Sequence, residues 1–80
     1  MKKVFTVEES ATLVEMRFEA GVLTLCFRDR KTGGRTDIEY DYPDPDGEHW
    51  NAITHADRPG TEARHRIRDG VLAHSNKRSV

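Results

Sequence analysis

Polar and apolar side chains alternate with a period of two in three consecutive segments, residues 12–18, 22–28 and 36–42. Successive side chains of a β-strand point to opposite faces, so each segment is typical of a strand with one buried face. Gly21 and the Gly33-Gly34 pair lie between the segments, and glycine is common where a chain reverses between strands. The alternation therefore predicts a three-stranded antiparallel meander.

The apolar side chains of the three segments should lie on one inner face of this sheet, which has to be buried against a second layer. The expected inner face consists of Val14, Met16, Phe18, Leu23, Leu25, Phe27, Ile38, Tyr40 and Tyr42. Leu13 is expected on the opposite face with the polar side chains. Exposed rings of Tyr40 and Tyr42 would stack on nucleic-acid bases, but their apolar neighbours favour rings in the core with hydroxyls at its rim.

The first segment suited to cover the inner face follows the third strand. Asp44 followed by Pro45 is typical of an N-cap with proline at the first helical position, which predicts a helix over about 45–56. Trp50 and Ile53 fall on one side of this helix. We expect Trp50 to fill the centre of the core.

A second helix is predicted over about 61–70, after a break at residues 57–60. Its inner side carries Ala63, Ile67 and Val71. Arg64 and Arg68 lie together on its exposed flank. The predicted fold class is therefore α+β, a three-stranded antiparallel meander with one face covered by two C-terminal helices.

The length of 80 residues, 35% of them hydrophobic, suits one small domain. We expect this domain to cover residues 11–73. Residues 1–10 either add a short extra strand or pack as an arm across the edge of the sheet. Residues 74–80 carry too few apolar side chains to fold alone, which predicts a flexible basic tail.

The chemically reactive side chains do not form a catalytic pattern. The histidines His49, His55, His65 and His74 are six, ten and nine positions apart, which fits no zinc-binding pair on a helix face. The single cysteine, Cys26, lies in an apolar run and is expected to be a buried thiol. The sequence predicts a protein that is not an enzyme and has neither a cofactor nor a metal site.

Charge is distributed unevenly along the chain, although the formal net charge is only −1. Residues 36–57 contain seven acidic side chains and no Lys or Arg. Residues 58–80 contain six Lys or Arg against two acidic side chains, and residues 28–35 contain four against one. The two basic segments are the candidates for binding an anion.

The first candidate site is the basic loop that surrounds the two glycines. Its cations are Arg28, Arg30, Lys31 and Arg35. Because glycine has no side chain, the backbone amides of Gly33-Gly34 are accessible to a phosphate group. The alternative is a soluble hairpin tip whose charges prevent edge pairing.

The second candidate site is the arginine pair of the second helix. Arg64 and Arg68 are four residues apart, so they present two guanidinium groups on one side of the helix, with His65 or Arg66 nearby. The alternative is an ordinary solvated helix face.

Several residues occur together in an order that is characteristic of one family. They are the segment Leu23-Thr24-Leu25-Cys26-Phe27, the pair of tyrosines in Tyr40-Asp41-Tyr42, then Pro45, Ala56, Gly60 and Ile67-Arg68. With this order and spacing the chain resembles the KTSC domain, a module found at the C-terminus of some lysyl-tRNA synthetases and as a stand-alone bacterial or phage protein. The resemblance implies no assigned activity, and it suggests RNA binding through the attachment to a synthetase.

The sequence thus favours a small non-catalytic module that binds a phosphate-bearing ligand, namely RNA, DNA or a nucleotide. The predicted ligand-binding residues are Arg28, Arg30, Lys31, Arg35, Arg64 and Arg68. The alternative is a phage or bacterial homo-oligomer, in which the basic segments meet the acidic segment of a second copy, and which captures a host protein or a signalling nucleotide.

A cytoplasmic location without membrane contact is expected. Even the longest uninterrupted apolar runs are no longer than Leu25-Cys26-Phe27, whereas a membrane span needs about 18 residues. The N-terminal segment also lacks the apolar stretch of an export signal.

Overall fold

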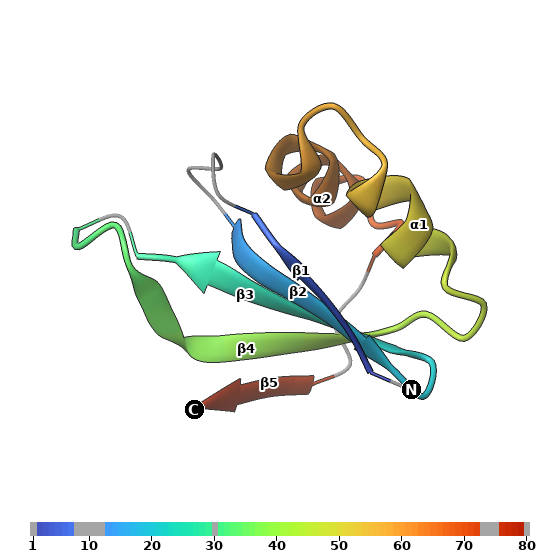
Figure 1. Cartoon of the computed structure of the whole chain (residues 1–80), viewed down its shortest axis with the longest axis horizontal. Coiled ribbons are helices and arrows are strands. Elements are labelled where there is room, and N and C mark those ends of the chain that lie inside the picture. The colour runs from blue at the N-terminus through green and yellow to red at the C-terminus, as the bar shows by residue number, and fades with distance from the viewer. Residues whose placement is uncertain (1, 8–12, 30, 73–75, 80) are drawn as a thin grey trace.

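The computed structural model describes residues 2–7, 13–29, 31–72 and 76–79. It is an α+β fold in which two helices lie on one face of an antiparallel sheet (Figure 1). The strands are β1 (Lys3–Thr6), β2 (Leu13–Glu19), β3 (Val22–Arg28), β4 (Arg35–Pro43) and β5 (Asn76–Ser79), and the helices are α1 (Glu48–Thr54) and α2 (Pro59–Arg68). The order of strands in the sheet is β1-β2-β3-β4-β5. The predicted fold class and the two covering helices are therefore confirmed, but the sheet is larger than predicted.

The predicted three-stranded meander corresponds to β2, β3 and β4, and a short strand extends it on each side. β1 pairs with β2, which is the strand alternative for residues 1–10. β5 pairs with β4, which corrects the prediction of a flexible tail for residues 76–79. The other residues of the predicted tail, 74, 75 and 80, lie outside the described residues. A free strand edge offers unpaired backbone N–H and C=O groups, and these can pair with a polar segment that lacks apolar side chains. Composition alone therefore could not predict β5.

A β-bulge in β2 changes which side chains face the core. Leu13 pairs with Phe27 and Glu15 pairs with Cys26, so Val14 is one residue in excess on its strand. The extra residue reverses the alternation of faces beyond it. Leu13 is completely buried in the core and Val14 only partly buried, which corrects the prediction of Leu13 outside and Val14 inside.

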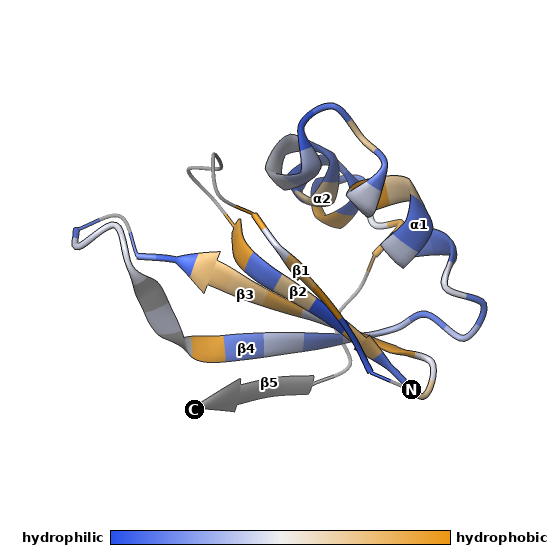
Figure 2. Cartoon of the chain, in the orientation of Figure 1, coloured by the Kyte–Doolittle hydropathy of each residue, from blue (hydrophilic) through white to orange (hydrophobic). Residues whose placement is uncertain are grey.

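The core lies between the sheet and the two helices. Trp50 of α1 packs against Phe18, with ring centroids 6.0 Å apart, and against the edge of Phe5, at 6.5 Å. Ile53 of α1 and Ala63 of α2 are completely buried beside them. The central position predicted for Trp50 is confirmed, and Figure 2 shows the alternation of apolar and polar residues along β2 beneath the helices.

The end of α2 differs from the prediction. The helix stops at Arg68, and Gly70 with φ 77° turns the chain away from the helical path. Val71 is therefore 58% exposed instead of lying on the inner side, and Leu72 is buried in its place. The helical period would place Val71 on the inner side only if the helix continued to this residue, and it does not.

Helix α1 begins three residues later than predicted, so Gly47 is its N-cap residue, where Asp44 was expected. The helix begins at Glu48, yet the buried Asp44 carboxylate accepts hydrogen bonds from the backbone N–H of His49, at 3.1 Å, and of Trp50, at 2.8 Å. Its own N–H donates to the carbonyl of Gly21 in the β2–β3 turn, at 2.9 Å. One buried residue thus joins the end of β4, the first turn of α1 and a turn of the sheet.

The two tyrosines of β4 belong to the core side of the sheet, as predicted. Tyr42 is 2% exposed, and Tyr40 is partly buried with its ring at 5.4 Å from that of Phe27. The buried ring of Tyr42 is not accessible for stacking on a base.

The two helices of the described part of the chain are both too short and too polar to cross a membrane.

Candidate functional site

The basic loop between β3 and β4 uses its backbone amides internally. The Asp29 carboxylate accepts hydrogen bonds from the N–H groups of Lys31, at 2.7 Å, and Thr32, at 3.4 Å. The N–H of Gly33 donates to the Asp29 carbonyl at 2.8 Å, and that of Gly34 donates to the Thr32 hydroxyl at 3.2 Å. Because these donors already have acceptors, the loop does not offer a preformed cradle of amides to a phosphate group.

The cations of this loop have different positions. The Arg28 guanidinium donates to the carbonyls of Gly33, at 2.6 Å, and Val7, at 3.3 Å, and so connects the loop to the segment after β1. Lys31 is exposed. Arg30 lies outside the described residues, and for Arg35 only the backbone position at the start of β4 is described.

Helix α2 places its arginines on two different sides. Arg64 and Arg68 are exposed and one turn apart, on the flank predicted for them. Arg66, which the sequence offered as a supporting cation, instead donates from Nε to Glu62 at 2.8 Å and from Nη1 to His49 Nδ1 at 3.0 Å. Arg66 therefore links α2 to α1 and is not part of an open site.

Arg58 is an exposed cation that the sequence reasoning treated only as part of a chain break. It is the N-cap residue of α2 and precedes Thr61 by three positions and Arg64 by six. Thr61, Arg64, His65 and Arg68 lie within the helix at intervals of three and four, which places them on one side, and Arg58 is exposed immediately before the first turn. We call this surface the α2 outer face; it consists of Arg58, Thr61, Arg64, His65 and Arg68. Its position six residues before Arg64 was the sequence signal that could have included Arg58 among the candidate residues.

The two predicted basic elements do not form one site. Figure 1 shows the tip of the β3–β4 hairpin projecting beyond the end of the sheet, well separated from α2. The described members of the six predicted ligand-binding residues therefore belong to two separate elements. Arg64 and Arg68 are the pair that the structure brings together.

Much of the acidic segment has intramolecular partners. Glu39 forms an ion pair with Arg17, Asp41 accepts a hydrogen bond from Thr24, and Asp44 caps α1. These contacts lower the number of carboxylates left to attract the basic surface of a second copy, which weakens the complementary-charge alternative.

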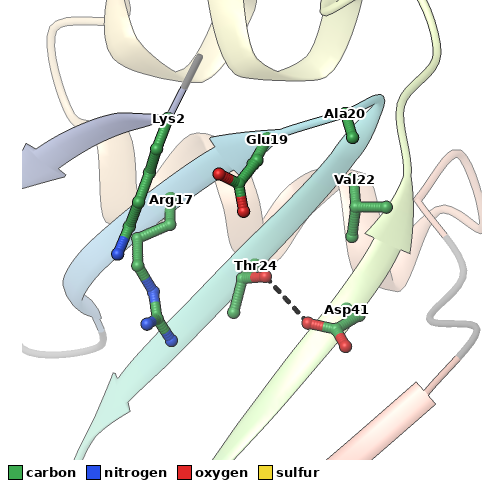
Figure 3. Close-up of a pocket in the computed structure, with 7 residues that line it drawn as sticks. All are labelled: Lys2, Arg17, Glu19, Ala20, Val22, Thr24 and Asp41. Atoms are coloured by element: carbon green, nitrogen blue, oxygen red, sulfur yellow. Dashed lines mark hydrogen bonds between the residues drawn. The ribbon is translucent and has the colours of Figure 1, made fainter.

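The outer face of the sheet carries a shallow pocket of about 420 Å³ with charges of both signs (Figure 3). Its lining consists of Lys2, Arg17, Glu19, Ala20, Val22, Thr24 and Asp41. Thr24 donates to Asp41 at 2.8 Å across its floor. The opposite charges cancel over a short distance, so this pocket does not form an anion site.

A buried polar group lies next to this pocket. The Cys26 thiol donates to Glu39 Oε2 at 3.5 Å and accepts from Arg17 Nη2 at 3.7 Å, while Arg17 and Glu39 form their ion pair. Burial lowers the pKa of Arg17, but its hydrogen bond to Glu39 and the nearby Cys26 and Glu39 raise it more, so the net pKa is raised above its ordinary value. Cys26 is a buried thiol as predicted, although it lies on the polar face of the sheet.

Within residues 2–7, 13–29, 31–72 and 76–79 the structure contains no cluster of three or more side chains able to hold a metal ion. No family model matches the chain, and no curated protein and no solved structure is similar enough to count as a match. The resemblance to the KTSC domain stays a prediction.

Proposed function

We propose that this chain is a small non-catalytic module that binds a phosphate-bearing polyanion through the α2 outer face. The observation that carries the proposal is that one arginine of α2 is bonded within the fold while two others are exposed on another side of the helix. Arg66 is held by Glu62 and His49, whereas Arg64 and Arg68 are exposed one turn apart. A guanidinium group binds phosphate through two parallel hydrogen bonds, so two of them on one helix turn suit a phosphate-bearing strand of nucleic acid.

The packing of α2 supports this assignment because it fixes the backbone from which Arg64 and Arg68 project. Gly60 and Ala63 are buried on the side opposite the α2 outer face, and Ile67 packs against the same core. A helix held in this way loses little further freedom when a ligand binds.

The basic loop has a secondary role in the proposal. Its amides are bonded internally and it lies apart from α2, so Lys31 is at most an additional contact to a long ligand. Membership of the KTSC family and a cytoplasmic location belong to the same proposal, with RNA or DNA as the polyanion, supported by the residues named in the sequence analysis.

The test is the affinity for labelled oligonucleotides, measured by fluorescence anisotropy over a series of salt concentrations. Each phosphate contact should contribute about −0.9 to the slope of log affinity against log salt for a duplex. The variant Arg64→Ala/Arg68→Ala should lose most of the affinity and reduce this slope by at least one such contact. Lys31→Ala should change both values less.

The matched control is Lys2→Ala/Lys3→Ala, which removes the same charge near the N-terminal end of β1, away from α2 (Figure 1). An equal loss in this control would show that only net charge matters and would contradict a site on α2. Absence of salt-dependent binding, together with a dimer in light scattering, would favour the homo-oligomer instead.

A further inference from the structure

We infer that α2 enters the major groove of B-form duplex DNA with the α2 outer face towards the bases. This inference rests on the proposed function and names the ligand of the same surface. The face carries three arginines together with Thr61 and His65, so it combines positive charge with side chains that hydrogen-bond to base edges.

The dimensions of the helix select among nucleic-acid grooves. α2 has ten residues and is therefore about 15 Å long, and a helix with its side chains is about 10–12 Å across. The major groove of B-DNA is about 12 Å wide, whereas the minor groove is about 6 Å wide and the major groove of A-form RNA is too narrow for side chains to read. Among these grooves, the major groove of B-DNA is the one that accepts an exposed helix.

The position of α2 in the fold leaves it accessible to a groove. Residues 55–58 connect α1 to α2, a length found in helix-turn-helix pairs, and Arg66 ties the two helices together. Figure 1 shows α2 on the side of the molecule away from β5. The side of α2 opposite its buried residues is thus free to approach a duplex.

The spacing along the helix assigns different roles to the arginines. Arg58 and Arg68 are ten residues apart, about 15 Å along the axis, so they reach phosphates at the two ends of the groove segment that the helix fills. Arg64 lies between them with Thr61 and His65 beside it. Arginine forms two hydrogen bonds to O6 and N7 of guanine, so Arg64 is assigned to a guanine base.

Two carboxylates limit the strength of this interaction. Asp57 and Asp69 are exposed at the two ends of the helix, and Asp69 Oδ1 lies 3.5 Å from Arg68 Nε. A phosphate would have to replace this contact. We therefore expect Asp69→Asn to bind duplex DNA more tightly than the wild-type chain, because it leaves Arg68 without a competing anion.

The experiment is a selection from a random DNA duplex pool, followed by anisotropy measurements at one fixed low salt concentration. The selected duplex is compared with a scrambled duplex, the single strand and an RNA duplex of the same sequence. The expected result is preference for a selected duplex that contains guanine. Arg64→Ala should reduce this preference by roughly 5- to 140-fold.

Matched variants separate contacts to bases from contacts to phosphates. Arg68→Ala should weaken the selected and scrambled duplexes equally and reduce the salt slope by about 0.9. Arg64→Lys keeps the charge but loses the paired hydrogen bonds, so it should retain general binding and lose the preference. These residues are exposed, and thermal melting checks that each variant folds as the wild-type chain does.

The outcomes distinguish this inference from the proposed function. Salt-dependent binding that depends on Arg64 and Arg68, but is equal for the DNA duplex, the single strand and the RNA duplex, overturns the groove assignment and leaves the proposed function intact. If Arg64→Lys prefers the selected duplex over the scrambled duplex as strongly as the wild-type chain does, the contact between Arg64 and guanine is overturned. Failure to bind any polyanion overturns both.

Discussion

Single residues with more than one partner determine how the elements of this small fold meet. The clearest case is Asp44, whose carboxylate accepts two amides of α1 while its backbone N–H binds the carbonyl of Gly21. The Asp-Pro order correctly indicated that Asp44 binds amides of the helix, but the N-cap position itself belongs to Gly47 and Pro45 precedes the helix. The distance between the cap and the helix could not be predicted, because it depends on Gly47, which adopts φ 70° immediately before Glu48.

Tyr42 should make the stability of the fold depend on alkaline pH. Burial, and in second place the neighbouring Tyr40, raises the pKa of Tyr42 from 10.0 to about 12. As the pH rises, the unfolded chain therefore loses this proton first. The contribution of neutral Tyr42 is complete below pH 10 and is lost between about pH 10 and 12, a total of about 2 to 3 kcal/mol.

The measurement for Tyr42 is the urea midpoint as a function of pH, from about pH 9 to 11.5. Tyr42→Phe has no phenol at this position, so its stability should fall less over the same range. Parallel curves for the two proteins would show that Tyr42 does not control the alkaline transition.

At the level of elements, the contact between α1 and α2 depends on a chain of three side chains. Glu62 accepts from Arg66, and Arg66 donates to Nδ1 of His49 on the other helix. The prediction from sequence placed Arg66 near the ligand, because a spacing along one helix says nothing about a partner on another. The helices themselves were predictable from their apolar periodicity. The bulge at Val14 was not, since the adjacent apolar residues Leu13 and Val14 do not show which of the two faces the core.

Arg66→Ala should lower the free energy of unfolding by about 1 kcal/mol, because it removes the bond to His49 and the pairing with Glu62. Arg64→Ala, an exposed substitution on the same helix, should change it by less than about 0.5 kcal/mol. Both values come from urea denaturation at neutral pH. Equal stability of the two variants would contradict a structural role for Arg66.

At the level of the whole molecule, the sheet places the basic loop and α2 in different regions, so the predicted site divides into two surfaces. The exposure of Arg64 and Arg68 was predictable from helical spacing, whereas Arg58 was missed because it precedes the helix. Their separation from the loop was not, because it follows from the path of the hairpin in space.

The strand β5 should contribute to stability through its backbone pairing with β4. Truncation before Asn76 removes this pairing and exposes the edge of β4, so the unfolding free energy should fall by about 1 to 2 kcal/mol and aggregation should increase. Lys77→Ala/Arg78→Ala changes the side chains but keeps the backbone, and serves as the control in urea denaturation and light scattering. The same loss in the control would assign the effect to side chains.

The strand order also has a consequence for the time course of folding. β1 to β4 are joined by consecutive short hairpins, whereas β5 reaches β4 only after both helices have been passed. Local hairpins close before a contact that spans a long loop, so β5 docks last. Removing β5 should therefore leave the refolding rate unchanged and accelerate unfolding, and slower refolding of the truncated chain would place β5 in the nucleus instead.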